Sequence, residues 1–396
     1  MIKQEKGFTL IELLITMVVF VLVMAAGAQI FTALLTQFKQ QSKIAETNIE
    51  GIVGLEMLRQ DIEHAGYGLP WAGMVTYNEA SSNPYNLNDS TATAVPRAIV
   101  SGNNVTFGGS NSIFNGSDYL VIKAVNVAIN DASIRWTTLR ISPFTAPYNP
   151  RVWTPASENL NYAGANPYVI VLSGGTGTNE RRLVTSGSTF YAQYSNITSS
   201  PWPPPDATET RIVYGVSPNT PLIMPFNRAD YFIRRFDGSG NNITPQRCAP
   251  NTGVLEKAML NHDQSGGEFR FLPLLDCVAD MQVNFWLDTD GDGIINWLPT
   301  SPSDNIGPTG LNLSAQQIRE QLKELRVYIV AHEGQRDINY DFSMNNAREA
   351  LSADEVLGGN SRTIFFVNLK NLVGDPEYKY YRWKVYTLVV KPNNIR

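Results

Sequence analysis

Residues 8–35 read FTLIELLITMVVFVLVMAAGAQIFTALL and contain a single charged residue, Glu12. This apolar stretch is longer than the roughly 20 residues that a helix needs to span a bilayer. Lys3 and Lys6 precede it and no lysine lies within it, so the charge distribution places the first residues in the cytoplasm and the rest of the chain outside. An ordinary secretory signal has a shorter apolar run that ends at a cleavage site, so this stretch predicts a helix that stays in the membrane.

The helical pattern continues after the apolar stretch. Apolar residues recur at helical spacing and no proline interrupts them, so one helix is expected from about Phe8 to about His64. At 1.5 Å per residue its length is on the order of 85 Å. Gly27, Gly51 and Gly54 are its weak points, since each costs about 1 kcal/mol relative to alanine.

The composition of the 396-residue chain excludes several classes of protein. Hydrophobic residues make up 43%, which is enough for a core and argues against wholesale disorder. The net charge of −5 provides no basic surface for phosphates, so nucleic acid is not expected as a partner. The mean hydropathy of −0.17 excludes a multi-pass membrane protein. Two cysteines and three histidines leave little material for a zinc or haem site.

From Tyr67 onward the sequence is typical of a β-rich protein. Gly, Pro, Asn and Ser are frequent, and short segments of β-branched or aromatic residues lie between turn residues. Residues 314–324 predict a helix that Ser314 caps, and residues 202–205, WPPP, predict a stiff extended linker. The expected strands are residues 119–127, 133–141, 168–172, 190–194, 211–215, 231–236, 269–272, 278–287, 326–332, 363–367 and 381–390.

These patterns together predict an α+β fold. A long N-terminal helix over residues 8–66, transmembrane in its first half, precedes a large, mostly antiparallel β-sheet head over residues 67–396. A domain has about 150 residues on average, and a division of the head into two subdomains near residues 200–225 is left open.

Glu12 is unusual because it lies within the membrane-spanning stretch. A carboxylate in hydrocarbon costs several kcal/mol, so it needs a partner. No cationic side chain lies within a helical turn of it. The nearest candidate is the amine that a cut between Gly7 and Phe8 would create.

Residues 6–14, KGFTLIELL, resemble the type III signal of type IV pilins and type II secretion pseudopilins. The resemblance implies that residues 1–7 are a leader, which a prepilin peptidase removes by cleavage after Gly7, and that Phe8 is then N-methylated. It also implies that Glu12 pairs with the Phe8 amine of a neighbouring subunit during filament assembly.

Four later segments are similar to PilW-type minor pilins. They are residues 58–67, LRQDIEHAGY; 230–233, DYFI; 278–283, VADMQV; and 382–390, RWKVYTLVV. Residues 70–225 carry no such similarity. The resemblance implies a structural subunit that primes assembly of a type IV pilus and sits at or near its tip.

The same resemblance implies partners and a location. The partners are other minor pilins and the major pilin, contacted through the N-terminal helix, the prepilin peptidase and an inner-membrane assembly platform, with a tip adhesin left open. The protein is expected first as a single-pass protein of the inner membrane with an extracytoplasmic head, and then in a pilus on the cell surface. The alternatives are a type II secretion minor pseudopilin of the J type, or a pilin-anchored extracytoplasmic adhesin.

Cys248 and Cys277 are the two cysteines of the chain. An exported domain lies in an oxidising compartment, which favours a disulfide over two buried free thiols. A loop of about 30 residues closed by this bridge adds roughly 3–4 kcal/mol of stability.

Residues 288–293, DTDGDG, resemble the start of an EF-hand calcium loop. Asp288, Asp290 and Asp292 would supply carboxylates, Ile294 its backbone carbonyl, and Asn296 a side chain or a bound water. The twelfth position is Pro299, which offers no ligand, so a bidentate carboxylate has to come from elsewhere, with Asp304 as a candidate. The alternative is a turn in which the aspartates bond their own backbone. Because three close carboxylates repel one another, calcium is the expected ligand.

No enzymatic activity is expected. The sequence has no Ser–His–Asp elbow, paired-cysteine motif, phosphate loop or HExxH zinc motif. Trp136, Trp153 and Tyr162 are expected in the core of a sheet rather than on a binding surface.

Overall fold

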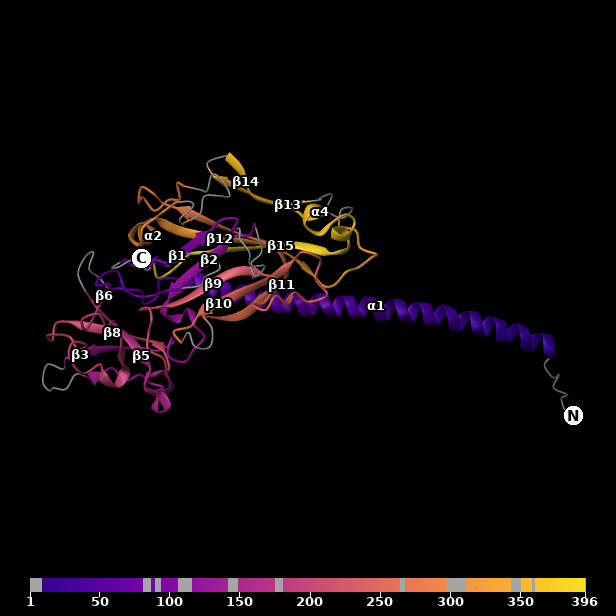
Figure 1. Cartoon of the computed structure of the whole chain (residues 1–396). Helices are drawn as coiled ribbons and strands as arrows, with labels where there is room; N and C mark the ends of the chain where they lie inside the picture. The colour runs from indigo at the N-terminus through magenta and orange to yellow at the C-terminus, as the bar shows by residue number, and fades with distance from the viewer. Residues whose placement is uncertain are drawn as a thin grey trace.

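The computed structural model consists of one long helix and a β-rich head (Figure 1). Helix α1 (Leu10–Glu63) is continuous over 54 residues, or about 80 Å. Its first half projects away from the head, and its second half lies along it (Figure 1). The predicted α+β fold is therefore confirmed. The structure describes residues 9–80, 87–89, 94–105, 116–141, 149–174, 181–263, 268–297, 306, 311–342, 350–357 and 360–395.

A seven-stranded sheet forms the centre of the head, and every neighbouring pair in it is antiparallel. Helix α1 packs against its β11, β12 and β15. The strands, in their order across the sheet, are β1 (Ile99–Gly102), β2 (Tyr119–Ala124), β9 (Asn227–Arg234), β10 (Gly253–Leu260), β11 (Phe269–Leu287), β12 (Leu322–Glu333) and β15 (Arg382–Val390).

The two faces of this sheet are both buried, and strand β12 shows how. Its alternate residues Val327 and Ile329 belong to the main core, which also contains Leu58 of α1. The residues between them, Tyr328 and Val330, belong to a second apolar cluster. Because side chains alternate across a strand, one face of β12 packs toward the helix and the other toward the C-terminal part of the head.

A second sheet is built from the chain between β2 and β9. Its order is β4-β3-β8-β5-β6, with β7 paired to β5. The chain thus leaves the seven-stranded sheet after β2 and re-enters it at β9. The strands are β3 (Trp136–Arg140), β4 (Asn149–Pro150), β5 (Tyr168–Ser173), β6 (Arg182–Leu183), β7 (Ala192–Gln193) and β8 (Thr210–Ser217).

The remaining elements are short. Helix α2 precedes β12, and helix α4 follows a two-stranded hairpin. Their bounds are α2 (Ala315–Gln321), β13 (Ala350–Leu357), β14 (Asn360–Asn368) and α4 (Leu369–Val373), and 3₁₀ turns occupy Val125–Val127, Ala156–Glu158, Tyr162–Gly164, Tyr194–Asn196 and Glu377–Tyr380.

The sequence pattern did not predict strand β10. Its sequence, GVLEKAML, contains two adjacent charged residues and good helix formers, so neither the strand period nor β-branched residues mark it. It is nevertheless buried along its whole length between β9 and β11, because Glu256 and Lys257 have ion-pair partners there. Pairing with two neighbours decided its structure.

Three local predictions need correction. The helix expected at residues 314–324 ends at Gln321, because the chain from Leu322 onward pairs with β11. The expected linker at residues 202–205 is a turn whose Trp202 is buried in the core of the six-stranded sheet. Trp136 and Trp153, expected in a core, are only partly buried, and Tyr162, expected there as well, is exposed.

Candidate functional site

The start of α1 places Glu12 in a capping box. Glu12 Oε2 accepts hydrogen bonds from the backbone N–H and the hydroxyl of Thr9, each at 2.9 Å, and Thr9 Oγ1 accepts the N–H of Glu12 at 3.4 Å. The spacing Thr-x-x-Glu is a capping signal that can be recognised in the sequence, and it gives Glu12 a hydrogen-bond partner without a positive charge. The carboxylate is solvent-exposed. Gly7 and Phe8 lie outside the described residues.

The first half of α1 exposes apolar side chains all round. Val18 is 55% exposed and Phe20 65% exposed, on different sides of the helix. Among the described residues, α1 is the helix that is long and apolar enough to cross a membrane. A helix that is hydrophobic on every side needs lipid or other apolar helices around it, so this half of α1 is consistent with anchoring in a membrane.

The second half of α1 is fixed to the head by a buried ion pair. Asp61 Oδ2 accepts hydrogen bonds from Lys257 Nζ in β10 and from the Tyr231 hydroxyl in β9. Desolvation raises the pKa of Asp61, although the Lys257 ammonium acts against that shift. Removing either charge would leave the other buried and unpaired, which is strongly destabilising. The pair therefore ties the helix to the centre of the sheet.

Two glycines allow α1 to approach β11 closely. A Cβ at Gly54 would lie 2.0 Å from the backbone oxygen of Leu274, and one at Gly51 would lie 2.9 Å from Leu275 Cδ1. Two of the three weak points of the helix are thus where it touches the head. A Cβ at Gly27, in the projecting half, would meet no atom within 4 Å.

The Asp-rich loop follows β11, and three of the predicted ligands come together in it. Asp288, Asp290 and Asp292 each offer a carboxylate oxygen within 4.8 Å of the others. Asp288 is buried and accepts the N–H groups of Gly291 at 2.7 Å and Gly293 at 2.9 Å. Both glycines have positive φ, 80° and 91°, which the tight loop requires.

The other predicted ligands of this loop have contacts within it. Asn296 Oδ1 accepts hydrogen bonds from the N–H and the hydroxyl of Thr289, at 2.9 and 3.0 Å. The Ile294 side chain is exposed, and its N–H donates to Asp292. Pro299 and Asp304 lie outside the described residues.

Lys323, at the start of β12, supplies a cation that the sequence did not reveal. Its Nζ lies 3.0 Å from Asp288 Oδ2. Desolvation would raise the pKa of Asp288, but the Lys323 ammonium and the loop N–H groups outweigh it and lower the pKa to about 2. The repulsion among the three carboxylates is therefore partly offset within the protein. Lys323 is distant in sequence, so no local motif could have identified it.

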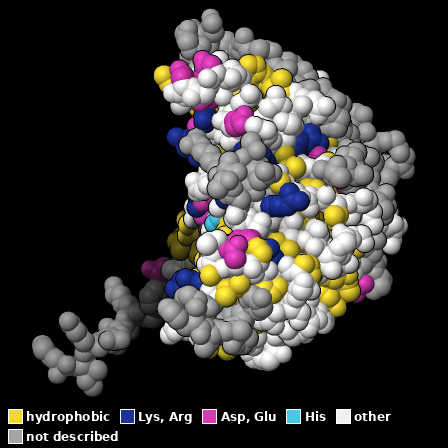
Figure 2. All heavy atoms as spheres, turned by 90° about the vertical axis from the view of Figure 1, so that its left-hand side faces the viewer, with side chains coloured by type: hydrophobic (Ala, Val, Ile, Leu, Met, Phe, Trp, Pro, Cys, Tyr) yellow, Lys and Arg dark blue, Asp and Glu magenta, His cyan; other side chains and the backbone are white. Residues whose placement is uncertain are grey.

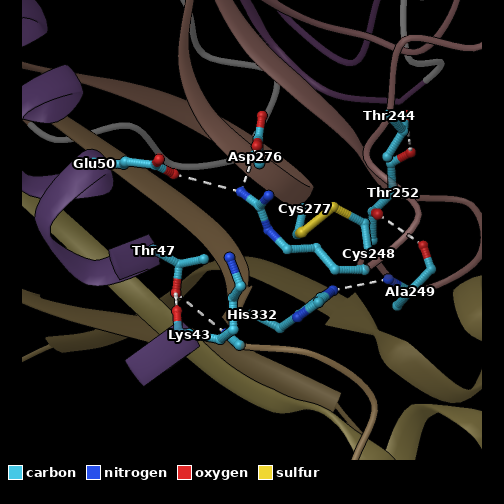
Figure 3. Close-up of a disulfide and its surroundings, with 12 residues drawn as sticks. Lys43, Thr47, Glu50, Thr244, Cys248, Ala249, Thr252, Asp276, Cys277 and His332 are labelled. Carbon is cyan, nitrogen blue, oxygen red and sulfur yellow. Dashed lines mark hydrogen bonds and ion pairs between the residues drawn. A yellow bond between two sulfur atoms is a disulfide. The ribbon is translucent and has the colours of Figure 1, made fainter. Parts of the chain in front are cut away.

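The structure contains the predicted disulfide between Cys248 and Cys277, whose Cα atoms are 4.9 Å apart. Arg247 precedes Cys248 and forms ion pairs with both Glu50 of α1 and Asp276, two carboxylates that Figure 3 shows near the disulfide. The Arg247 guanidinium lies 3.5 Å from the first carboxylate and 2.6 Å from the second. The bridge therefore holds a loop that contacts the helix.

His332 lies beside this disulfide (Figure 3). Its Nε2 accepts the N–H of Ala249 at 2.8 Å, and its ring contacts Tyr381 and Trp383. Burial lowers the pKa of His332 to about 3, so the ring is neutral at physiological pH.

A buried network of charges lies at the β2–β9 side of the head. Lys123 Nζ and Arg228 Nη1 each lie 2.8 Å from the carboxylate of Glu79, and Lys123 also contacts Asp89 at 2.8 Å. Arg228 also pairs with Asp230 at 2.7 Å. This network was not predicted from the sequence, although a Lys inside the apolar strand YLVIKA indicates a buried partner.

Comparison with known families finds the prokaryotic N-terminal methylation motif at residues 2–28. No curated protein and no solved structure matches the chain. The matched residues include Gly7, Phe8 and Glu12, and such a motif implies contact with other pilins and with a prepilin peptidase in general. The motif, the exposed apolar helix and the antiparallel head support a type IV pilin-like or pseudopilin-like protein.

Proposed function

We propose that this chain is a PilW-like minor pilin. In this role it is a structural subunit without catalytic activity, stored in the inner membrane with an extracytoplasmic head. It then primes assembly of a type IV pilus, together with other minor pilins on the assembly platform, and sits at or near the tip.

The observation that carries the proposal is the exposed Glu12 carboxylate on an otherwise apolar helix surface. Thr9 gives it hydrogen bonds but no positive charge. A charge left in hydrocarbon costs several kcal/mol. The Phe8 amine of a neighbouring subunit, freed by cleavage after Gly7, would neutralise it. Because a misplaced subunit would leave the carboxylate unpaired, the pairing also sets the axial register.

The bulk of the head supports a position at the tip. The whole β-rich part of the chain lies around one end of α1 (Figure 1). Heads of this size would obstruct close lateral packing along a shaft, whereas a terminal subunit has free space above it. Immunogold labelling of the head is expected at filament ends, and labelling spread evenly along the filament would refute the tip position.

Substitution of Glu12 tests the pairing. Glu12→Val and Glu12→Gln should both insert into the membrane but enter sheared pili at least about tenfold less, because both lack the charge that the amine needs. Glu46→Gln is the matched control, since it removes an exposed carboxylate from the same helix, one that pairs with Lys43 of that helix at 2.6 Å. Incorporation of Glu12→Gln at the level of Glu46→Gln would contradict the proposal.

A type II secretion pseudopilin is the second candidate, because it shares the N-terminal motif. Deletion of the gene separates the two functions. Loss of surface pili with normal protein secretion supports the minor pilin, and the reverse result supports the pseudopilin.

We also propose that the Asp-rich loop binds calcium. The convergence of three carboxylates and the burial of Asp288 support the site. Lys323 competes with the metal for Asp288, so affinity is expected to be weak. The absence of a bidentate carboxylate at the twelfth position of the loop should also lower the affinity for calcium.

Thermal unfolding of the full-length protein in detergent tests this site. Calcium should raise the melting temperature relative to chelator, since a ligand that binds only the folded state stabilises it by about 2.7 kcal/mol at 100 times Kd. Asp290→Ala should remove the response, while Asp237→Ala, in another exposed turn, should keep it. Identical wild-type curves with calcium and with chelator would refute the metal site.

A further inference from the structure

A cavity of the head, with a volume of about 980 Å³, lies beside α2. Trp71, Arg97, Arg319 and the loop before α2 contribute to its wall. It belongs to the end of the head that lies away from the N-terminus of α1, where α2 and β1 lie (Figure 1). Burial of the projecting half of α1 in a membrane or among other helices therefore does not by itself cover the cavity.

Arg319 of α2 is the unusual group in this cavity. Its guanidinium lies 4.7 Å from the centre of the Trp71 ring, and the Arg181 guanidinium lies 4.5 Å from that ring. Two cations thus gather around one indole. Within the part of the chain that the structure describes, no carboxylate forms an ion pair with Arg319. Glu320, the adjacent acid, accepts a hydrogen bond from Gln316 instead.

The other guanidinium in the lining of the cavity, that of Arg97, is already matched. Arg97 pairs with Asp89 at 2.6 Å, and Asp89 also contacts the buried Lys123. Arg319, which has no ion-pair partner among the described residues, therefore has capacity for an added anion. Burial and the Arg181 cation lower the pKa of Arg319, although the adjacent Glu320 carboxylate acts against that shift. A guanidinium binds a carboxylate through two parallel hydrogen bonds.

The rest of the lining indicates what else the ligand carries. Val95 and Leu313 are apolar and partly buried, and the exposed amides of Asn312 and Gln316 stand beside them. Such a wall suits a molecule with apolar C–H faces and hydroxyl groups. The volume is that of a pocket for a ligand of several rings rather than for a small inorganic ion.

We propose that this cavity binds an acidic saccharide, with a sugar carboxylate on Arg319 and hydroxyls on Asn312 and Gln316. Figure 2 views this end of the head and shows Lys and Arg side chains standing among hydrophobic and uncharged ones rather than massed in a patch. A specific pocket, and not a general positive surface, is therefore the source of recognition.

Calorimetric titration of the full-length protein in neutral detergent, at about 0.15 M salt, tests the proposal. Trigalacturonic acid should bind, and neutral galactotriose should bind at least about tenfold more weakly, since a charge-assisted hydrogen bond is lost. Arg319→Gln should weaken binding of the acid by a similar factor. Arg319→Lys keeps the charge but lacks the planar guanidinium, so its affinity for the acid should lie between those of the wild type and Arg319→Gln. If Arg319→Gln unfolds at a lower temperature than the wild type, Arg319→Lys replaces it in the test.

Arg151→Gln is the matched control. Arg151 also stacks on a tryptophan, 4.1 Å from the Trp153 ring, but in the other sheet, so its removal should not change binding. Equal binding of the acidic and neutral sugars, binding that is unaffected at position 319, or no binding at millimolar acid would overturn the proposal. Binding of triglutamate in place of the sugar acid would assign the cavity to acidic peptides and overturn it as well.

Discussion

Charged side chains are buried inside the head where groups of opposite charge lie beside them. Lys123 and Arg228 have no exposed side-chain surface, yet each contacts carboxylates within 2.8 Å. Asp280 in β11 is different, because no Lys or Arg among the described residues forms an ion pair with it. Desolvation raises the pKa of Asp280 to about 7, against hydrogen bonds from Gln282 and Met281. Asp280 therefore makes the stability of the head sensitive to pH.

Asp280→Asn tests this sensitivity. Between about pH 4 and pH 7 the folded state keeps a proton that the unfolded chain has lost, so stability falls as pH rises, by up to about 1.4 kcal/mol per pH unit. The asparagine variant lacks this loss and should gain stability over the wild type as pH rises from 5 to 8. Chemical unfolding of the full-length protein across that range measures the difference.

The fully buried Asp118 is part of the same effect, because its charge and that of Asp280 repel each other. Asp237→Asn is the control, since hydrogen bonds from Asn241 lower the pKa of Asp237 and its charge does not change between pH 5 and pH 8. A constant difference between wild type and Asp280→Asn over this range would show that Asp280 is not protonated in the folded protein.

At the scale of elements, the contact between α1 and β11 decides how the helix is held. The backbone of the helix comes so close to Leu274 that Gly54 has no space for a Cβ. The oxygen that blocks it belongs to the backbone of β11, which pairs with β10 on both sides of Leu274, at Leu275 and Pro273, so it has little freedom to move away. Glycine is therefore required here for close approach, in spite of its cost in helix propensity.

Gly54→Ala should weaken this docking. Overpacking costs about 1–3 kcal/mol, and a clash with a fixed backbone falls at the upper end. Gly27→Ala adds the same methyl group to the projecting half of the helix, where it meets nothing, and should leave unfolding of the head unchanged. Denaturant unfolding of both full-length variants makes the comparison; equal midpoints would contradict the role assigned to Gly54.

At the scale of the whole molecule, the disulfide joins the loop before β10 to strand β11. Cys277 lies next to Val278, where the pairing of β11 with β12 begins. The disulfide closes a loop with a sequence separation of 29 residues next to the helix contact. The loop beside it reaches α1 through Arg247 and Glu50. Constraining this loop in the unfolded chain stabilises the arrangement of helix and sheet together.

Replacement of Cys248 and Cys277 by serine should lower the free energy of unfolding by roughly 3–4 kcal/mol, from the loop-closure estimate. Urea unfolding of the full-length protein measures the loss. Wild-type protein treated with reductant should show the same decrease, and reductant should not affect the double variant. An unchanged wild-type midpoint under full reduction would contradict the prediction.

The sequence by itself determined the features that depend on neighbours in the chain. An uninterrupted apolar run specifies the first half of α1, the residues around Gly7 and Glu12 specify the motif, and turn residues between β-branched segments specify an antiparallel head. The clustering of Asp288, Asp290 and Asp292 follows in the same way, because a tight turn brings alternate residues together.

Only the tertiary structure decided which charges are buried and where the chain is closely packed. Asp61 meets Lys257 across 196 residues, and Glu79 meets Arg228 across 149. Strand β10 and the cavity at Arg319 likewise depend on segments far apart in sequence. The physical reason is that the cost of burying a charge, or of placing a Cβ, is set by atoms that only folding brings near, and local periodicity carries no record of them.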